Sequence, residues 1–348
     1  MSELDARKGV VLKAVVRDFV NTNRPVGSDR LIDAFSITWK SATVRNELSD
    51  LDDLGFLRQP HVSAGRVPTE RGYRYYVDQL MDIPDAVPAS EAQTAQRACR
   101  RAKAEVDAIL LETCRILTRL TSYPAVASNP DTNSTYLRQV FLSLVPPRSV
   151  LLVAVFSNGK VEHSMLEQSG PTTAQCVELA ARQVNAVVAG KALRQLGLVH
   201  LQANSANTPS AVVAQRALEA LQGVAASLSR QRVWLEGTNQ LLHQPEFRDA
   251  ERLEALLRIL DQHNALYRIL AATARPGRLM VSIGKENSHE AMQACSVVCT
   301  TYQIGGRTAG YLGVFGPTRL HYDRAAAAVN LMANSLSQAL TQVSKSWD

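Results

Sequence analysis

"SATVRNELSDLDDLGFL", residues 41 to 57, decides how the N-terminal part of the chain folds. At about 100° per residue, Val44, Leu48 and Leu51 fall in one narrow stripe, which predicts a helix whose apolar side faces a core. Ser41 is a good N-cap for this helix, and Gly55 is a residue type that ends helices. The opposite face carries Ala42, Asn46, Ser49 and Asp53, flanked by Thr43 and Arg45.

The segments on either side complete a small domain. Residues 4–21 repeat apolar positions every three or four residues, which predicts an amphipathic helix, and Ser28 is expected to cap a short second helix over 29–35. After Gly55, residues 56–69 contain two extended limbs around the tip "SAGR" at 63–66. Three helices followed by a hairpin predict a winged helix-turn-helix.

The N-terminal half of the third helix suits the major groove of DNA. A small residue, a hydroxyl, an Arg and an Asn can meet a thymine methyl, phosphate, guanine and adenine, and residues 42–46 offer this set. Asp50, Asp52 and Asp53 crowd the other end, where phosphate would repel them. A face that only meets water is the alternative interpretation of the same pattern.

The hairpin and the next helix extend the predicted DNA-binding surface. Ala64 and Gly65 would let the backbone approach phosphate, and Arg66 would enter an adjacent groove. Residues 69–80 would contact phosphates or simply begin another helix. The complete set that we expect to contact DNA is Ser28, Ser41, Ala42, Thr43, Arg45, Asn46, Ser49, His61, Ser63, Gly65, Arg66, Arg71, Tyr73 and Arg74.

Charge and composition agree with a nucleic-acid-binding protein without demonstrating one. The net charge is +6 and the pI about 9.1, yet residues 1–80 carry 12 Lys and Arg against 11 Asp and Glu. The longest apolar run, at 150–156, is far shorter than a membrane span, and the N-terminus lacks the features of a secretory signal. We therefore expect a cytoplasmic protein without a membrane segment, whose five cysteines are free thiols.

No motif predicts catalysis, a cofactor or a metal. The Gly-rich "IGGRTAGYLGVFG" at 304–316 lacks both nucleotide-loop fingerprints. Cys295 and Cys299 on a strand would lie roughly 13 Å apart, too far for one metal ion. "GKEN" at 284–287 has no nucleophile beside it and is better explained as a turn. We expect the protein not to be an enzyme.

The remaining chain predicts an α+β protein of several domains. A Pro-rich linker at 82–92 follows the head, residues 1–81. Strand-like segments near 135–168 and 278–320 enclose a helical stretch, which suggests one domain inserted in another. The expected boundaries are 93–165 together with 275–348 for the outer domain and 166–274 for the inserted one.

Two stretches resemble one bacterial family. "PVGS", "SATVRNELSDLDDLGFL" and "QPHVSAGRVPTERGYRYYVD" occur in the order and spacing of the heat-inducible transcription repressor family HrcA. "GKEN" and "CSVVCTTYQIGGRTAGYLGVFGPTRLHY" at 295–322 resemble its C-terminal strands. The resemblance implies a winged-helix head, a GAF-like domain and a dimerisation domain inserted in it.

The resemblance also implies a function. Members of this family repress heat-shock (chaperone) operons by binding an inverted-repeat operator in double-stranded DNA as a homodimer, and the GroEL chaperonin maintains their activity, which heat stress abolishes. A two-fold dimer presents two recognition helices a whole number of DNA turns apart, so an inverted repeat is its natural target. Two alternatives remain: a regulator whose GAF-like domain binds a small effector, and an enzyme tethered to DNA by its head.

Overall fold

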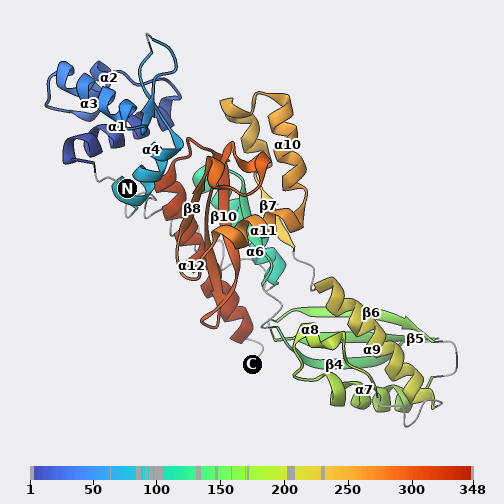
Figure 1. Cartoon of the computed structure of the whole chain (residues 1–348). Helices are drawn as coiled ribbons and strands as arrows, with labels where there is room; N and C mark the ends of the chain where they lie inside the picture. The colour runs from blue at the N-terminus through green and yellow to red at the C-terminus, as the bar shows by residue number, and fades with distance from the viewer. Residues whose placement is uncertain are drawn as a thin grey trace.

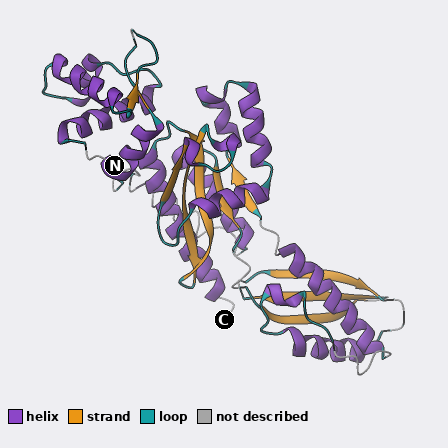
Figure 2. Ribbon diagram, in the orientation of Figure 1, coloured by secondary structure: helices purple, strands orange, loops and turns teal. Residues whose placement is uncertain are grey.

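The chain forms three units arranged in a row, which Figures 1 and 2 show as a head, a middle unit and a third unit. The structure, a computed structural model, describes residues 4–345 except 63, 84–87, 89, 91–92, 94–96, 98–104, 131–134, 146–147, 158, 169, 171, 202–207 and 229–231. Most of the expected linker at 82–92 thus lies outside the described residues. Helices and strands are both abundant, so the α+β class is confirmed at the level of a mixed fold.

The head contains the helices that periodicity predicts. Helices α1 (Ala6–Thr22), α2 (Ser28–Phe35) and α3 (Ser41–Asp53) pack against one another. Val44, Leu48 and Leu51 are buried as expected, against apolar residues of α1 such as Val11 and Val15. Asp18, itself buried, receives two hydrogen bonds from Arg30, which ties α1 to α2.

The predicted serine caps are wrong. Helix α2 takes Gly27 as its N-cap and α3 takes Lys40, neither with a side-chain cap bond. Ser28 and Ser41 stand inside their helices, and their Oγ atoms lie 3.1 Å apart, while the Ser41 hydroxyl donates to Asp29 Oδ1 at 2.5 Å. The hydroxyls therefore join the starts of α2 and α3 to each other.

The hairpin after α3 is real but has short strands. Strand β1 (Leu57–Arg58) pairs antiparallel with β2 (Val67–Pro68). Val26 forms an additional bridge with Arg66, with N···O distances of 2.9 and 2.8 Å. Helix α4 (Glu70–Tyr75) follows and continues as a π-helix, η1 (Tyr76–Leu80), toward the middle unit.

The middle unit is an antiparallel five-stranded sheet covered on both faces. The strand order is β7–β3–β10–β9–β8. One buried cluster joins one face to α6 and α12, and another joins the other face to α10, α11 and nearby 3₁₀ turns. The strands are β3 (Ala125–Ser128), β7 (Val233–Glu236), β8 (Met280–Ile283), β9 (Cys295–Ile304) and β10 (Arg307–Pro317). The helices are α6 (Val106–Thr121), α10 (Ala250–Leu260), α11 (His263–Thr273) and α12 (Tyr322–Lys345), with 3₁₀ turns η3 (Thr238–His243), η4 (Pro245–Phe247), η5 (Gly284–Glu286) and η6 (Glu290–Met292).

The third unit has a sheet and a core of its own. Strands β4 (Leu137–Val145), β5 (Ser149–Phe156) and β6 (Val161–Glu167) form the predicted antiparallel meander. Helices α7 (Ala174–Val188), α8 (Leu193–Leu196) and α9 (Pro209–Leu228) pack on one face of this sheet, and a separate buried cluster joins them to it. Figure 1 shows this unit at the end of the molecule opposite the head.

The strand grouping differs from the sequence prediction. The sequence analysis assigns residues 93–165 and 275–348 to one domain and 166–274 to another. In the structure, β4–β6 pair only with each other among the described strands. Residues 233–273 belong to the middle unit. The reason is that antiparallel strands of either sheet carry the same alternating pattern, so periodicity does not reveal which strands pair. The described chain therefore enters the third unit near residue 135 and leaves it near 228.

Candidate nucleic-acid interface

The outer face of α3 is open to solvent. Ala42, Arg45, Asn46 and Ser49 are exposed, while Ser41 and Thr43 are half-buried at its margin. Within the described part of the chain, neither the Arg45 nor the Asn46 side chain has an ion-pair or hydrogen-bond partner in the protein. These consecutive Arg and Asn side chains are thus free to donate to and accept from base edges.

Asp50 and Asp52, at the acidic end of α3, are paired with cations of the head itself. Lys8 of α1 places its Nζ 3.0 Å from both Asp50 Oδ2 and Glu47 Oε2. These two carboxylates, together with Asp5, raise the pKa of Lys8 above its usual value. Arg66 pairs with Asp52, with Nε 2.8 Å from Oδ2. The cation expected to enter a groove instead holds the hairpin against the C-terminal half of α3.

The hairpin tip is built by local contacts. Gln59 Nε2 donates to the carbonyls of Val62 and Ala64, each at 2.9 Å, and so braces the loop from within. His61 and Val62 are exposed at the tip, whereas Ser63 lies outside the described residues. A Cβ at Gly65 would stand 2.4 Å from the carbonyl carbon of Val26. Gly65 is therefore required by contact with Val26, a reason that the sequence interpretation did not contain.

The residues of α4 point toward the protein rather than away from it. Arg71, which is exposed, donates from Nη1 to Leu54 O at 2.8 Å and lies 4.5 Å from the centre of the Phe56 ring. Tyr73 is buried, and its ring centre is 5.7 Å from that of Tyr322 in the middle unit. Arg74 pairs with Glu286, also in the middle unit. Neither Tyr73 nor Arg74 is placed to meet DNA, and neither is Ser28, which is buried.

Sequence reasoning missed Lys40. It is the N-cap of α3 and is exposed beside Ala42. A cation at this position can meet a phosphate that flanks the groove. Its place immediately before a helix with no acidic residue in the first turn was the signal available in the sequence.

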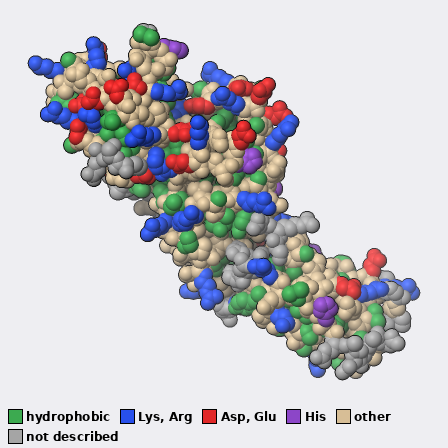
Figure 3. Space-filling model, in the orientation of Figure 1, with side chains coloured by type: hydrophobic (Ala, Val, Ile, Leu, Met, Phe, Trp, Pro, Cys, Tyr) green, Lys and Arg blue, Asp and Glu red, His purple; other side chains and the backbone are tan. Residues whose placement is uncertain are grey.

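The head is not uniformly basic. Figure 3 shows Lys and Arg side chains beside Asp and Glu side chains over the head, in keeping with its near-balanced charge. The distribution of paired and unpaired cations therefore matters more than their number. Arg45 and Lys40 border the start of α3, while Lys8 and Arg66 are paired near its end.

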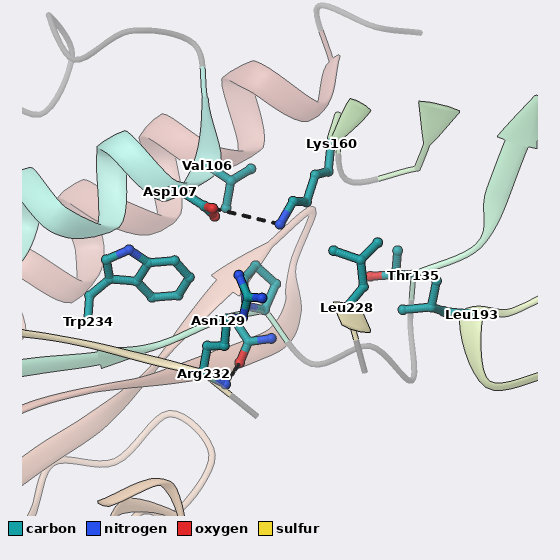
Figure 4. A pocket seen from close by; sticks show the side chains of 10 residues that line it. Val106, Asp107, Asn129, Thr135, Lys160, Leu193, Leu228, Arg232 and Trp234 are labelled. Atoms are coloured by element: carbon teal, nitrogen blue, oxygen red, sulfur yellow. Dashed lines mark hydrogen bonds and ion pairs between the residues drawn. The ribbon is translucent and has the colours of Figure 1, made fainter. Parts of the chain in front are cut away.

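The junction between the middle and third units holds a small cavity rather than a ligand pocket. It has a volume of about 30 Å³, room for water only. Lys160 Nζ reaches across the junction to Asp107 Oδ2 at 3.7 Å, as Figure 4 shows. Among the described residues, no group of three or more His, Cys, Asp or Glu side chains is arranged to hold a metal.

Two further findings concern membrane-spanning helices and cysteines. Over the described residues, no helix combines the length and apolarity needed to cross a membrane. Cys114, Cys176, Cys295 and Cys299 are free thiols, and Cys99 lies outside the described residues.

Comparison with known proteins identifies the family. The family model for the HrcA protein C-terminal domain matches residues 107–326. Heat-inducible transcription repressor HrcA of Moorella thermoacetica is 39% identical over 344 residues, covering 98% of this chain and 99% of the relative. That of Desulforamulus reducens is 33% identical over 348 residues and 99% of both chains.

A solved structure shares the fold. A crystal structure described as that of a hypothetical protein, at 2.2 Å resolution, superposes with a TM-score of 0.70 at 22% identity, covering 98% of this chain and 100% of the other. The family model and the near full-length relatives identify the chain on their own. The chain belongs to the HrcA family of heat-inducible transcription repressors.

Proposed function

We propose that this repressor of heat-shock genes reads its operator with the N-terminal half of α3. The observation that carries the proposal is the contrast within that helix: Arg45 and Asn46 are exposed and unpartnered, whereas Asp50 and Asp52 are paired with cations of the head. Ala42, Thr43 and Ser49 complete the reading face, Lys40 precedes it, and the exposed His61 lies in the hairpin.

The three units fit the architecture that the family resemblance implies. Residues 1–81, with three helices and a hairpin, are proposed as a winged helix-turn-helix domain, and the five-stranded middle unit as a GAF-like domain. The third unit is proposed as the dimerisation domain, inserted near residues 135–228. Buried clusters pack on both faces of the middle sheet. The alternative, a GAF-like domain that binds a small effector, would be supported by a ligand-induced rise in melting temperature.

The homodimer is proposed to form through the open face of the third unit's sheet. Cross-strand register places one set of residues on the face away from α7 and α9, and several of its members are exposed. This face comprises Gln139, Phe141, Ser143, Val145, Ser149, Leu151, Val153, Val155, Val161, His163, Met165 and Glu167. It is mostly apolar, with the charged Glu167 at one end. A mostly apolar face is compatible with a second copy of itself, as a two-fold interface requires.

Substitution of an exposed aromatic residue on this face tests the dimer. Phe141→Glu places a charge on the proposed interface at a side chain that is 50% exposed, so the unit should remain folded. Sedimentation velocity is expected to show a dimer for the wild type and a monomer for the variant. Leu179→Glu, at a similarly exposed apolar residue on α7, is the matched control and should remain dimeric. Dissociation by Leu179→Glu but not by Phe141→Glu would place the interface on the helical side.

The chaperonin partner follows from the family resemblance and has its own test. We propose that GroEL keeps the repressor active and that heat stress abolishes its activity. The purified protein, heated and returned to growth temperature, should regain operator binding with GroEL and ATP but not with ATP alone. Full operator binding well above growth temperature without chaperonin would contradict this proposal.

DNA reading itself is tested by fluorescence anisotropy at about 0.15 M salt, fixed because phosphate contacts make affinity depend steeply on salt. The wild type should prefer a duplex with the family's inverted repeat over a scrambled duplex by roughly a thousandfold or more. Arg45→Ala and Asn46→Ala should each lose about 1–3 kcal/mol of this discrimination. Arg252→Ala, at an exposed Arg of α10, is the control and should bind as the wild type does. Equal binding to both duplexes by folded wild type would refute the proposal.

A further inference from the structure

The head is packed onto the middle unit rather than tethered to it. A single buried cluster runs from α1 and α3 through Tyr73, Tyr75 and Tyr76 into α6, α12 and the middle sheet. The third unit, by contrast, has a cluster of its own. Domains that move independently keep separate cores, so the head and the middle unit are built to move as one body.

One arginine clamp joins α4 to the "GKEN" turn. Arg74 donates from Nε to Glu286 Oε1 at 2.8 Å, and from Nη2 to Glu286 Oε2 at 2.5 Å and to Val281 O at 2.6 Å. Its Nη1 reaches Asp78 at 3.0 Å. A bidentate pair with an added carbonyl bond fixes direction as well as distance.

The turn that carries Glu286 is itself held firmly. The buried Asn287 amide donates to the carbonyls of Gly284, Met292 and Cys295, at 2.9–3.0 Å. Glu286 Oε2 also accepts the backbone N–H of Ile283 at 2.9 Å. Glu286 is therefore presented to Arg74 in one orientation by the middle unit.

A second arginine clamp joins the middle unit to α1. Arg319 donates from Nη1 to Val20 O at 3.2 Å, near the C-terminus of α1, where a cation also meets the negative end of the helix dipole. The same side chain pairs with Glu246 and donates to Gln244 Oε1 at 3.0 Å. The clamps thus hold α1 and α4, two different elements of the head.

Both clamps leave the reading face of α3 free. Figure 1 shows α4 beside β8 and α12, with α3 on the side of the head that faces away from the middle unit. Arg45 and Asn46 remain exposed in this docked arrangement. The docking is therefore compatible with DNA binding and does not mask the recognition helix.

We propose that Arg74, Glu286 and Arg319 are positioning residues that set the half-site spacing of the operator. Because the head cannot swivel on the middle unit, the two recognition helices of a dimer are held at one separation and one angle. This inference rests on the proposed dimeric DNA-binding function. One base pair of extra spacing shifts a half-site by about 3.4 Å and turns it by about 35° around the DNA axis, a mismatch that a fixed head cannot follow.

The test compares the full-length wild type with two variants on duplexes whose half-sites are moved apart or together by one and two base pairs, and on a single half-site. Glu286→Gln removes the charge from a side chain that is 41% exposed and keeps its shape. A second variant adds Glu246→Gln to loosen the Arg319 clamp as well. Glu254→Gln, in an exposed ion pair with Arg258 on α10, is the matched control.

The wild type and the control should lose about tenfold or more in affinity for each base pair of altered spacing, within the range of coupling energies between sites in proteins. The clamp variants should lose about threefold or less, while their affinity for a single half-site stays within about twofold of the wild type. A loss of affinity with altered spacing that is as steep in both clamp variants as in the wild type would overturn the inference. So would a wild type that binds the native repeat specifically but accepts every spacing. A wild type that binds the native repeat no better than a scrambled duplex would instead refute the proposed function.

Discussion

Single residues of the head take their roles from partners that are distant in the sequence. Arg45, Arg66 and Arg74 are equivalent in a sequence interpretation, yet the first faces solvent, the second pairs with Asp52 and the third with Glu286. Periodicity correctly predicted that Val44, Leu48 and Leu51 are buried. It could not predict the partners of arginines, because Glu286 lies more than 200 residues after Arg74.

Gly65 provides a prediction about the hairpin. Gly65→Ala would place a Cβ 2.4 Å from backbone atoms of Val26, so the bridge between Val26 and Arg66 must open. We expect a loss of about 1–3 kcal/mol in the free energy of unfolding of the head, the usual cost of overpacking. Urea denaturation followed by circular dichroism measures it. Gly197→Ala, where the backbone is in the right-handed helical region and a Cβ meets nothing within 4 Å, is the control. Equal stability of the two variants would contradict the close approach.

The cysteines provide a prediction about reactivity. Burial raises the pKa of both Cys295 and Cys299 to about 12, whereas Cys176 is partly exposed. At pH 8 the two buried thiols stay protonated in the folded state, so iodoacetamide should modify Cys176 much faster than either. Folding raises the pKa of both thiols, so above about pH 9 they ionise more readily in the unfolded chain than in the folded one. Their titration therefore destabilises the folded protein only above about pH 9. Peptide mapping by mass spectrometry would refute this if Cys295 reacted as fast as Cys176.

At the scale of elements, the sequence predicted what is local and missed what depends on pairing. The helices of the head, the β4–β6 meander, strands β8–β10 and the final helix from Tyr322 all occur where expected. The apolar alternation of β5 is the same whichever sheet it joins, so its separation from β9 and β10 could not be predicted. In residues 304–316, Gly305 and Gly306 make the turn between β9 and β10, and Gly313 leaves room for Cys299.

The edge of strand β4 provides a prediction at this scale. Asn185 of α7 accepts a hydrogen bond from Val140 N at 2.9 Å and donates to Val140 O at 2.7 Å, which occupies backbone groups on the open edge of the sheet. Asn185→Ala should lower the free energy of unfolding by about 1–3 kcal/mol and promote aggregation through the exposed edge. Urea midpoints and light scattering measure both effects. Gln183→Ala, exposed on the same helix, should change neither.

At the scale of the molecule, the head, the middle unit and the third unit divide the work of a repressor. The head carries the exposed face of α3, the middle unit holds the head through two arginine clamps, and the third unit has a mostly apolar sheet face that we propose as the dimer interface. The function was predicted from the family resemblance. The reason that Tyr73 and Arg74 face the middle unit, which is their contact with Tyr322 and Glu286, came from the structure.

Selection of DNA by the full-length protein from a library of random duplexes tests the central claim most directly, because it assumes no operator. If the α3 faces of a dimer read DNA together, the recovered sequences will contain an inverted repeat with one fixed spacing. The Arg45→Ala protein will enrich this repeat less and will lose base preference at the position that Arg45 reads. Recovery of unrelated sequences by the wild type, or of the same repeat with undiminished enrichment and base preference by Arg45→Ala, would contradict the assignment of α3 as the reading element.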